Sequence, residues 1–314
     1  MDIDEICNTI QTYLKEPPLV IWGSGATIGF GLPSMSKLKD EIGTAIPLFD
    51  KTCTDLEVEL SKDKYEAELP QIRKIIRDVV YKADIKAKEN LLNNTDDFEG
   101  IKRLTSFCHD PHPKVMNVVS TNYDRILEYV WGYNGIRYTD GFDQQELSVF
   151  DENKFLDKDI INLMKVHGSL DWFDVDHEVR KMSIGFRFDP VMIPPGKNKY
   201  RTTHYSPYRE LMQKSDDAIK KAPSFLVVGF GFNDEHITPL VSKKTKAGTP
   251  IVVVTMKVTP TTEKQLEKAK KVIYIEADTD INKSRIRIIE NGNIISDTIE
   301  DEQFWKLNKF MDIL

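Results

Sequence analysis

The chain has 314 residues, of which 40% are hydrophobic and 30% charged, and its formal net charge is −7. This length allows one large domain or two modest ones with a sizeable core. The negative charge argues against a strong non-specific hold on nucleic acid or on an anionic membrane surface. No apolar run approaches the roughly 20 residues that span a bilayer. The acidic N-terminus and three widely spaced cysteines (Cys7, Cys53 and Cys108) indicate a reducing, cytoplasmic location.

Apolar spacing predicts alternating helices and strands along the chain. Helices are expected at 3–15, 35–46, 124–133, 207–220, 235–246, 261–271 and 301–314. Strands are expected at 18–23, 115–120, 161–167, 190–195, 224–230, 250–256 and 272–277. The stretch 54–108 reads as mostly helical, 134–160 as irregular, and 171–187 and 285–299 as hairpins, the last around an Asn-Gly turn.

Continuously apolar strands separated by helices predict a mainly parallel α/β sheet that is doubly wound, like the Rossmann fold, with helices on both faces. We therefore expect a single domain over residues 1–314. A helical insertion at about 54–110 would form a subdomain on it, and a hairpin and helix at about 284–314 would end it. The insertion and the terminal helix, with Trp305 and Phe310, are candidate contact surfaces.

Four predicted strands end in glycine or polar residues, and ligands of open parallel sheets bind at the carboxyl ends of strands. The first strand runs into a turn with four glycines between 23 and 31, which suits close approach to a phosphate. The others end in Asn122 and Asp124, in His167, and in a glycine pair at 229 and 231. Each has a simpler explanation, namely a ligand-free turn, a helix cap, a partly buried histidine or a tight turn.

Together these segments resemble sirtuin motifs, in the sirtuin order, over about residues 18–280. The glycine turn with Pro33 resembles the opening sirtuin motif, Thr121 to Asp124 the Asn-x-Asp segment, and His167-Gly168 the catalytic His-Gly. Gly229 and Gly231 occupy the place of the sirtuin Gly-Thr-Ser. The opening turn comprises Gly23, Ser24, Gly25, Ala26 and Thr27, and Asp278 lies where the last sirtuin strand closes over the adenine.

The cysteine pattern differs from that of sirtuin deacylases and indicates which sirtuin-like proteins the chain resembles. Those enzymes carry two Cys-x-x-Cys pairs after the catalytic histidine, whereas the last cysteine here is Cys108. The pattern resembles zinc-free bacterial sirtuin-like proteins that hydrolyse NAD+, many of them in anti-phage defence. The resemblance implies NAD+ as substrate, no zinc, a homo-oligomer, and a separate partner such as a hexameric translocase-type ATPase or another phage-sensing protein. No sequence-specific contact with nucleic acid and no membrane contact are expected.

If the protein hydrolyses NAD+, each group of these residues has an expected role. The turn at 23–27 would hold the pyrophosphate, and a side chain at Gly25 would meet it. By resemblance, Asp124 would bind the nicotinamide carboxamide, while Asn122 would orient the ribose hydroxyls or the attacking water. His167 is suited to accept a proton at neutral pH. Two alternatives remain open, a module that binds NAD+ or ADP-ribose without turnover, and an ADP-ribosyl or acyl transferase.

Overall fold

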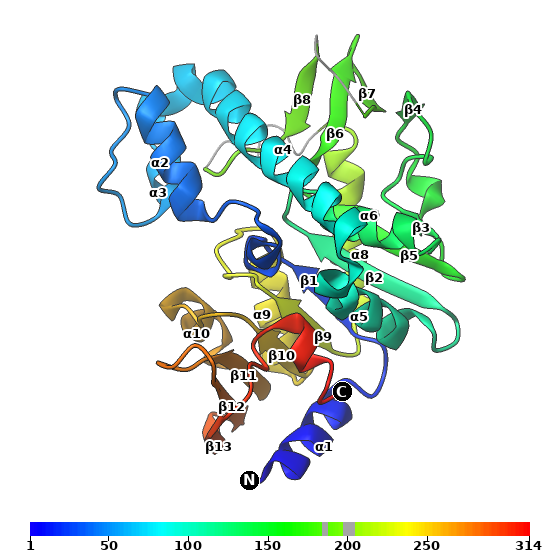
Figure 1. Cartoon of the computed structure of the whole chain (residues 1–314), viewed down its shortest axis with the longest axis vertical. Coiled ribbons are helices and arrows are strands. Elements are labelled where there is room, and N and C mark those ends of the chain that lie inside the picture. Colours follow the sequence, from blue (N-terminus) through cyan, green and yellow to red (C-terminus); the bar gives the residue numbers. More distant parts are fainter. Residues whose placement is uncertain (184–187, 197–204) are drawn as a thin grey trace.

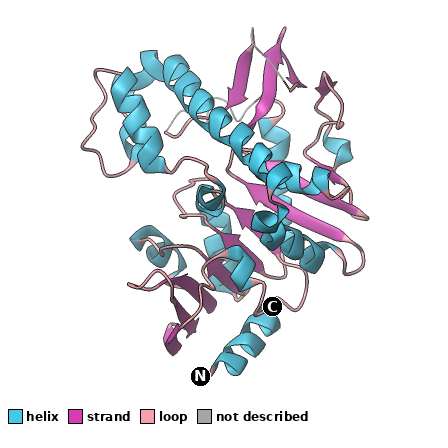
Figure 2. Ribbon diagram, viewed as in Figure 1, coloured by secondary structure: helices cyan, strands magenta, loops and turns pink. Residues whose placement is uncertain are grey.

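The computed structural model of the chain describes residues 1–183, 188–196 and 205–314 (Figures 1 and 2). Its main sheet has nine strands among the described residues. They are β1 (Leu19–Trp22), β2 (Val115–Ser120), β3 (Tyr138–Thr139), β5 (Ile160–Lys165), β9 (Phe225–Val228), β10 (Ile251–Val254), β11 (Lys271–Ala277), β12 (Ser284–Glu290) and β13 (Asn293–Glu300).

The strand order confirms the predicted doubly wound fold. Across the sheet it is β13-β12-β11-β10-β9-β1-β2-β5-β3, with β12 and β13 antiparallel at one edge and the other strands paired in parallel. From β1 the chain adds β2 and β5 on one side and later β9, β10 and β11 on the other. The winding direction therefore switches at the boundary between β1 and β9, where such sheets hold their ligands.

Helices cover both faces of the sheet (Figure 2). They are α1 (Ile3–Tyr13), α2 (Met35–Ala45), α3 (Leu56–Leu60), α4 (Leu69–Asn93), α5 (Glu99–His109), α6 (Ile126–Tyr133), α8 (Tyr208–Lys221), α9 (Ile237–Ala247), α10 (Pro260–Leu266) and α11 (Leu307–Phe310). Successive strand side chains point to opposite faces. Val20 and Trp22 of β1 lie in the core with α1, α5 and α6, whereas Leu19 and Ile21 lie in the core with α8 and α9.

The predicted helical insertion consists mainly of α3, α4 and α5. In Figure 1, α4 is the long cyan helix that crosses the upper part of the molecule. Its buried residues recur at intervals of three or four, as expected for a helix with one face against the core, and it contacts α2, α6 and β8. They are Ile72, Ile76, Val80, Asp84, Ala87 and Leu91.

A second, antiparallel sheet contains the predicted hairpin that follows β5. Its strand order is β4-β7-β6-β8. The strands are β4 (Ser148–Val149), β6 (Gly168–Val175), β7 (Glu178–Lys181) and β8 (Asp189–Met192). The hairpin prediction for 171–187 is confirmed by the pairing of β6 with β7, while its last four residues lie outside the described part of the chain.

The structure corrects several element predictions. The helix predicted for 301–314 is reduced to the four residues of α11, and Phe310 is fully buried, so it offers no contact surface. The glycine turn leads first into two short 3₁₀ turns and not directly into α2. The region 134–160, expected to be irregular, contributes β3 and β4. Among the described residues, no helix has both the length and the apolar composition needed to cross a membrane.

Candidate functional site

The glycine turn after β1 packs directly on the loop after β9, at the switch point of the sheet. The Gly25 backbone N–H donates to the Gly229 carbonyl at 2.9 Å, and Gly23 N–H donates to Val228 O at 3.0 Å. A Cβ atom on Gly25 would lie 2.9 Å from Gly229, and one on Gly229, whose φ is +61°, would lie 2.0 Å from Ala26 N. Glycine is therefore required here by the contact of two backbones, whatever ligand approaches the turn.

Asn122 follows β2 and reaches across to this turn. Its Nδ2 donates to Gly23 O at 3.1 Å and to the Thr27 hydroxyl at 3.3 Å. The residue is 5% exposed, and its Oδ1 is buried without a hydrogen-bond partner in the described part of the chain. A buried acceptor without a donor costs about 1–3 kcal/mol, so this oxygen suits a ligand hydroxyl or a water molecule.

Asp124 is buried against the same turn. Its Oδ2 accepts from the Thr27 hydroxyl at 3.1 Å, and its Oδ1 accepts from Ile126 N at 3.3 Å. The second bond closes a local turn ahead of α6, whose N-cap is Arg125 and which has no side-chain cap bond, so Asp124 does not cap the helix. Burial raises the pKa of the Asp124 carboxyl group to about 6, and the nearby Lys165 ammonium opposes part of that shift.

Lys165, at the end of β5, holds the loop that carries Asn122 and Asp124. Its Nζ is almost completely buried and donates to Asp124 O at 2.6 Å, to Glu128 Oε1 at 2.7 Å and to Ser169 Oγ at 2.9 Å. Burial raises the pKa of the Glu128 carboxyl group to about 7, against the pull of this ammonium. These bonds join the strand ends of β2 and β5.

A buried ion pair joins the same loop to the insertion. Arg125 donates from Nε and Nη2 to Asp84 Oδ2 of α4, at 3.1 and 2.7 Å, and its backbone N–H donates to Oδ1 at 2.7 Å. The Tyr129 hydroxyl also donates to Asp84 Oδ2, at 2.6 Å. We call Asp84, Arg125 and Tyr129 the α4 clamp.

His167 lies just beyond β5, on the strand next to the one that carries Asn122. Ser120 and Lys165 are register partners, so both side chains follow neighbouring parallel strands at the same edge. His167 Nε2 lies 2.8 Å from Oδ2 of Asp234, a residue that sequence reasoning missed. The partner follows the glycine pair at 229 and 231, so the only sequence signal for it was its place after another strand end.

The remaining predicted residues are less closely joined. Thr121 and Ser24 are half-buried and flank the cluster, with Thr121 N bonded to Trp22 O at 3.2 Å. A Cβ on Gly231 would make only an ordinary contact with the Asn233 side chain, at 3.9 Å, and the Gly231 carbonyl accepts from Thr262. Pro33 lies just before α2. Asp278 follows β11, two strands from β9, and its hydrogen bonds within the described part of the chain go to Thr279 and Lys283.

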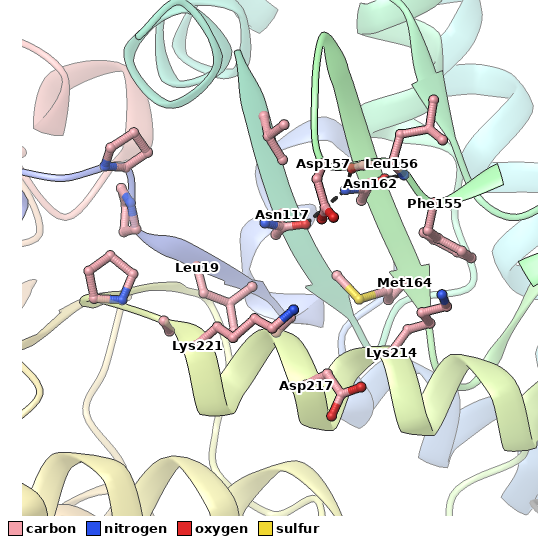
Figure 3. Close-up of a pocket in the computed structure, with 16 residues that line it drawn as sticks. Leu19, Asn117, Phe155, Leu156, Asp157, Asn162, Met164, Lys214, Asp217 and Lys221 are labelled. Carbon is pink, nitrogen blue, oxygen red and sulfur yellow. Dashed lines mark hydrogen bonds between the residues drawn. The ribbon is translucent and has the colours of Figure 1, made fainter. Parts of the chain in front are cut away.

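A pocket of about 260 Å³ lies near the amino ends of the strands, at the opposite end from the candidate site (Figure 3). It is bounded by the amino ends of β1 and β2, by β5 and by α8. Asn117 and Asn162 line it and bond to each other at 2.9 Å, and Lys214 and Lys221 of α8 border it. None of the predicted site residues lines this pocket, so it is separate from the candidate site.

In the described part of the chain, no three histidine, cysteine, aspartate or glutamate side chains are grouped to hold a metal ion. A search of the curated proteins found no match.

Several solved structures are similar to this chain. One comes from a study of the mechanism and regulation of Sir2 enzymes, with 13% identity, 84% of this chain and 90% of that one covered, and a TM-score of 0.45. Another is Sir2Tm bound to a propionylated peptide, with 13% identity, coverage of 83% and 89%, and a TM-score of 0.47. A third is a Sir2–p53 peptide–NAD+ complex, with 12% identity, coverage of 83% and 89%, and a TM-score of 0.45.

Residues 116–275, just over half of the chain, match the family described as the SIR2-like domain. This stretch contains β2, β5 and β9, with Asn122, Asp124, His167 and Asp234. The chain therefore belongs to the SIR2-like domain family.

Proposed function

We propose that this protein binds NAD+ at the carboxyl ends of β1, β2, β5 and β9 and hydrolyses its nicotinamide–ribose bond. The observation that carries the proposal is Asn122 Oδ1, a buried acceptor that has no partner among the described residues and lies between the glycine turn and the strand of His167. Such an acceptor suits a ribose hydroxyl or the attacking water. Membership of the SIR2-like family and an NAD+ complex among the similar structures support the same substrate.

The proposed reaction needs no covalent bond between the substrate and the protein. The bond between C1′ and the nicotinamide nitrogen breaks, and its electron pair returns to the pyridine ring, which leaves as a neutral molecule. Water attacks C1′ through a transition state with oxocarbenium character and gives up a proton to His167, which releases it to solvent. Positioning and one proton acceptor therefore account for most of the catalysis.

Each side chain has a distinct part in this scheme. The glycine turn would face the pyrophosphate at half-buried Ser24 and exposed Gly25, where the lack of a side chain on Gly25 permits close approach. The other N–H groups of the turn, like that of Gly25, already donate to carbonyl groups of the protein. The Asp124 carboxylate accepts a hydrogen bond from the nicotinamide carboxamide, since a carboxylate has lone pairs beyond the two that Thr27 and Ile126 engage. Asn122 Oδ1 orients a ribose hydroxyl or the water.

The direct test is to incubate the purified chain with NAD+ and to measure nicotinamide and ADP-ribose. We expect both products in equal amounts. His167→Ala and Asn122→Ala should each lower turnover by about 10²–10⁴-fold while remaining folded. Binding of NAD+ without products would favour the binding module. A stable His167→Ala protein with normal turnover would remove that residue from the mechanism.

Adding an acetylated peptide tests the transferase alternative. We expect neither deacetylation nor faster release of nicotinamide with the peptide. We also expect metal analysis to find no stoichiometric zinc, because the sequence lacks Cys-x-x-Cys pairs. About one tightly bound zinc per chain, or peptide-dependent turnover, would support the transferase instead.

The cellular role that we propose is depletion of NAD+ as the effector of a bacterial anti-phage defence system. Its support is the resemblance to zinc-free sirtuin-like NADases.

A further inference from the structure

The pair formed by His167 and Asp234 is buried and well defined. The two side chains are 7% and 4% exposed, and Nε2 lies 2.8 Å from Oδ2. An ionised carboxylate can only accept a hydrogen bond, so Nε2 must carry the proton that is shared. Among the described residues, the other ring nitrogen, Nδ1, has no hydrogen-bond partner.

The second oxygen of Asp234 fixes the orientation of the carboxylate. Oδ1 accepts from His236 N at 2.9 Å and from Ile237 N at 2.8 Å, the first residues around the start of α9. Asp234 therefore connects a helix start to the imidazole ring. Rotation of the carboxylate away from His167 would break both backbone bonds.

We propose that Asp234 is a positioning residue that holds His167 in the tautomer protonated at Nε2, which leaves Nδ1 as the nitrogen that accepts the proton of the attacking water. The inference rests on the proposed NAD+ hydrolysis for its catalytic consequence, but the tautomer is a property of the protein alone. The same carboxylate also stabilises the imidazolium that forms when Nδ1 takes up the proton.

Asp234→Asn is the sharpest variant, because its Oδ1 can still accept from the start of α9. Its amide nitrogen would face Nε2 and donate to it, which forces the ring proton onto Nδ1 and removes the acceptor. Long-range ¹⁵N–¹H spectra of ¹⁵N-histidine protein report the tautomer directly. The chain has six histidines, and His167→Gln identifies the signal of interest.

A matched control lies elsewhere in the molecule. Asp216 Oδ1 is 2.8 Å from His236 Nε2, the same separation, but this pair is about a third exposed. Asp216→Asn should leave the His167 tautomer, the melting temperature and NAD+ turnover unchanged.

We expect the wild-type His167 signal to be that of the Nε2–H form and the Asp234→Asn signal to be that of the Nδ1–H form. Turnover of NAD+ should fall by about 10²–10⁴-fold in Asp234→Asn with little change in KM, because the lost group acts on the water and not on substrate binding. The melting temperature should stay close to that of the wild type.

Two results would overturn the proposal, an unchanged tautomer in Asp234→Asn, or a changed tautomer with normal turnover. If the wild-type protein releases no nicotinamide while its His167 is the Nε2–H form and switches in Asp234→Asn, the proposed function fails but the positioning role stands.

Discussion

Burial shifts the pKa of the Asp124 carboxyl group, and this shift predicts how activity depends on pH. Its pKa is raised to about 6 because the carboxyl group is buried, and only the ionised form accepts a carboxamide hydrogen bond through both oxygens. We predict that kcat/KM for NAD+ hydrolysis falls as pH decreases through about 6. The measurement is a pH–rate profile of the wild-type protein and of Asp124→Asn.

In Asp124→Asn this acidic limb should be absent, with a higher KM throughout. An acidic limb that is identical in both proteins belongs to another group and would contradict the assignment. The raised pKa of Asp124 also makes the stability of the folded protein depend on pH. Because the folded pKa lies above the usual aspartate value of about 3.9, this group stabilises the folded protein below about pH 4, and the contribution is lost as pH rises through about 6.

At the scale of elements, the turn after β1 offers a matched pair of glycines. A Cβ on Gly25 would lie 2.9 Å from Gly229, whereas one on Gly29 would meet no atom of the described residues within 4 Å. We predict that Gly25→Ala lowers the melting temperature and weakens NAD+ binding together, because the turn must move away from the β9 loop. Gly29→Ala should keep the wild-type melting temperature.

Thermal unfolding of both variants measures the effect of the added methyl group on packing, and calorimetric titration measures its effect on NAD+ affinity. Loss of NAD+ affinity in Gly25→Ala at an unchanged melting temperature would instead mean that the added methyl group meets the pyrophosphate.

The α4 clamp couples the insertion to the site loop. The Arg125 and Asp84 side chains are 10% and 0% exposed, so Asp84→Ala leaves a buried guanidinium without its carboxylate. We predict a loss of about 3–5 kcal/mol in the free energy of unfolding, with lower NAD+ turnover because the loop with Asn122 and Asp124 loses its anchor.

Asp78→Ala is the control on the same helix. Asp78 pairs with Arg77 at 3.1 Å but is 44% exposed, so its loss should cost no more than about 1 kcal/mol. Urea unfolding of the two variants measures the difference. Equal stabilities would show that the clamp is not a significant anchor.

The parts predicted from the sequence are those that local pattern determines. The strand VMNVVS (115–120) was predicted to the residue, because a run of β-branched side chains ends abruptly in polar ones. Asp234 and the α4 clamp could not be predicted, since each depends on a contact between residues far apart in the chain. The terminal helix was overestimated because residues 301–306 are held by tertiary bonds, such as Trp305 Nε1 to Ile281 O at 3.1 Å.

For the whole molecule, control of activity is the main prediction. An unregulated NADase would be toxic to its own cell, so we predict low turnover for the dilute monomer and a rise on assembly with itself or with a phage-sensing partner. The insertion exposes apolar side chains that suit such contacts, including Val58 at 64% and Leu92 at 63%. Turnover measured against protein concentration, alongside light scattering, tests this. Full activity in a dilute monomer would contradict it.

The number of domains is also a property of the whole molecule. We propose that residues 1–314 form one domain, because the α4 clamp buries charged groups from both the insertion and the segment that follows β2. A single cooperative thermal transition is the expected behaviour.

The position of β1 inside the sheet, between β9 and β2, also bears on the order of events in folding. Val20 pairs with Val118 on one side, while Leu19 pairs with Phe225 on the other, far along the chain. Loops this long close slowly, since their entropy is lost before the strand contacts form. During synthesis, β1 is made before either of its partner strands, β2 and β9. The contact of the glycine turn with Gly229 can therefore form only after β9 has been made, so the candidate site is completed later than the part of the sheet formed by β1, β2 and β5.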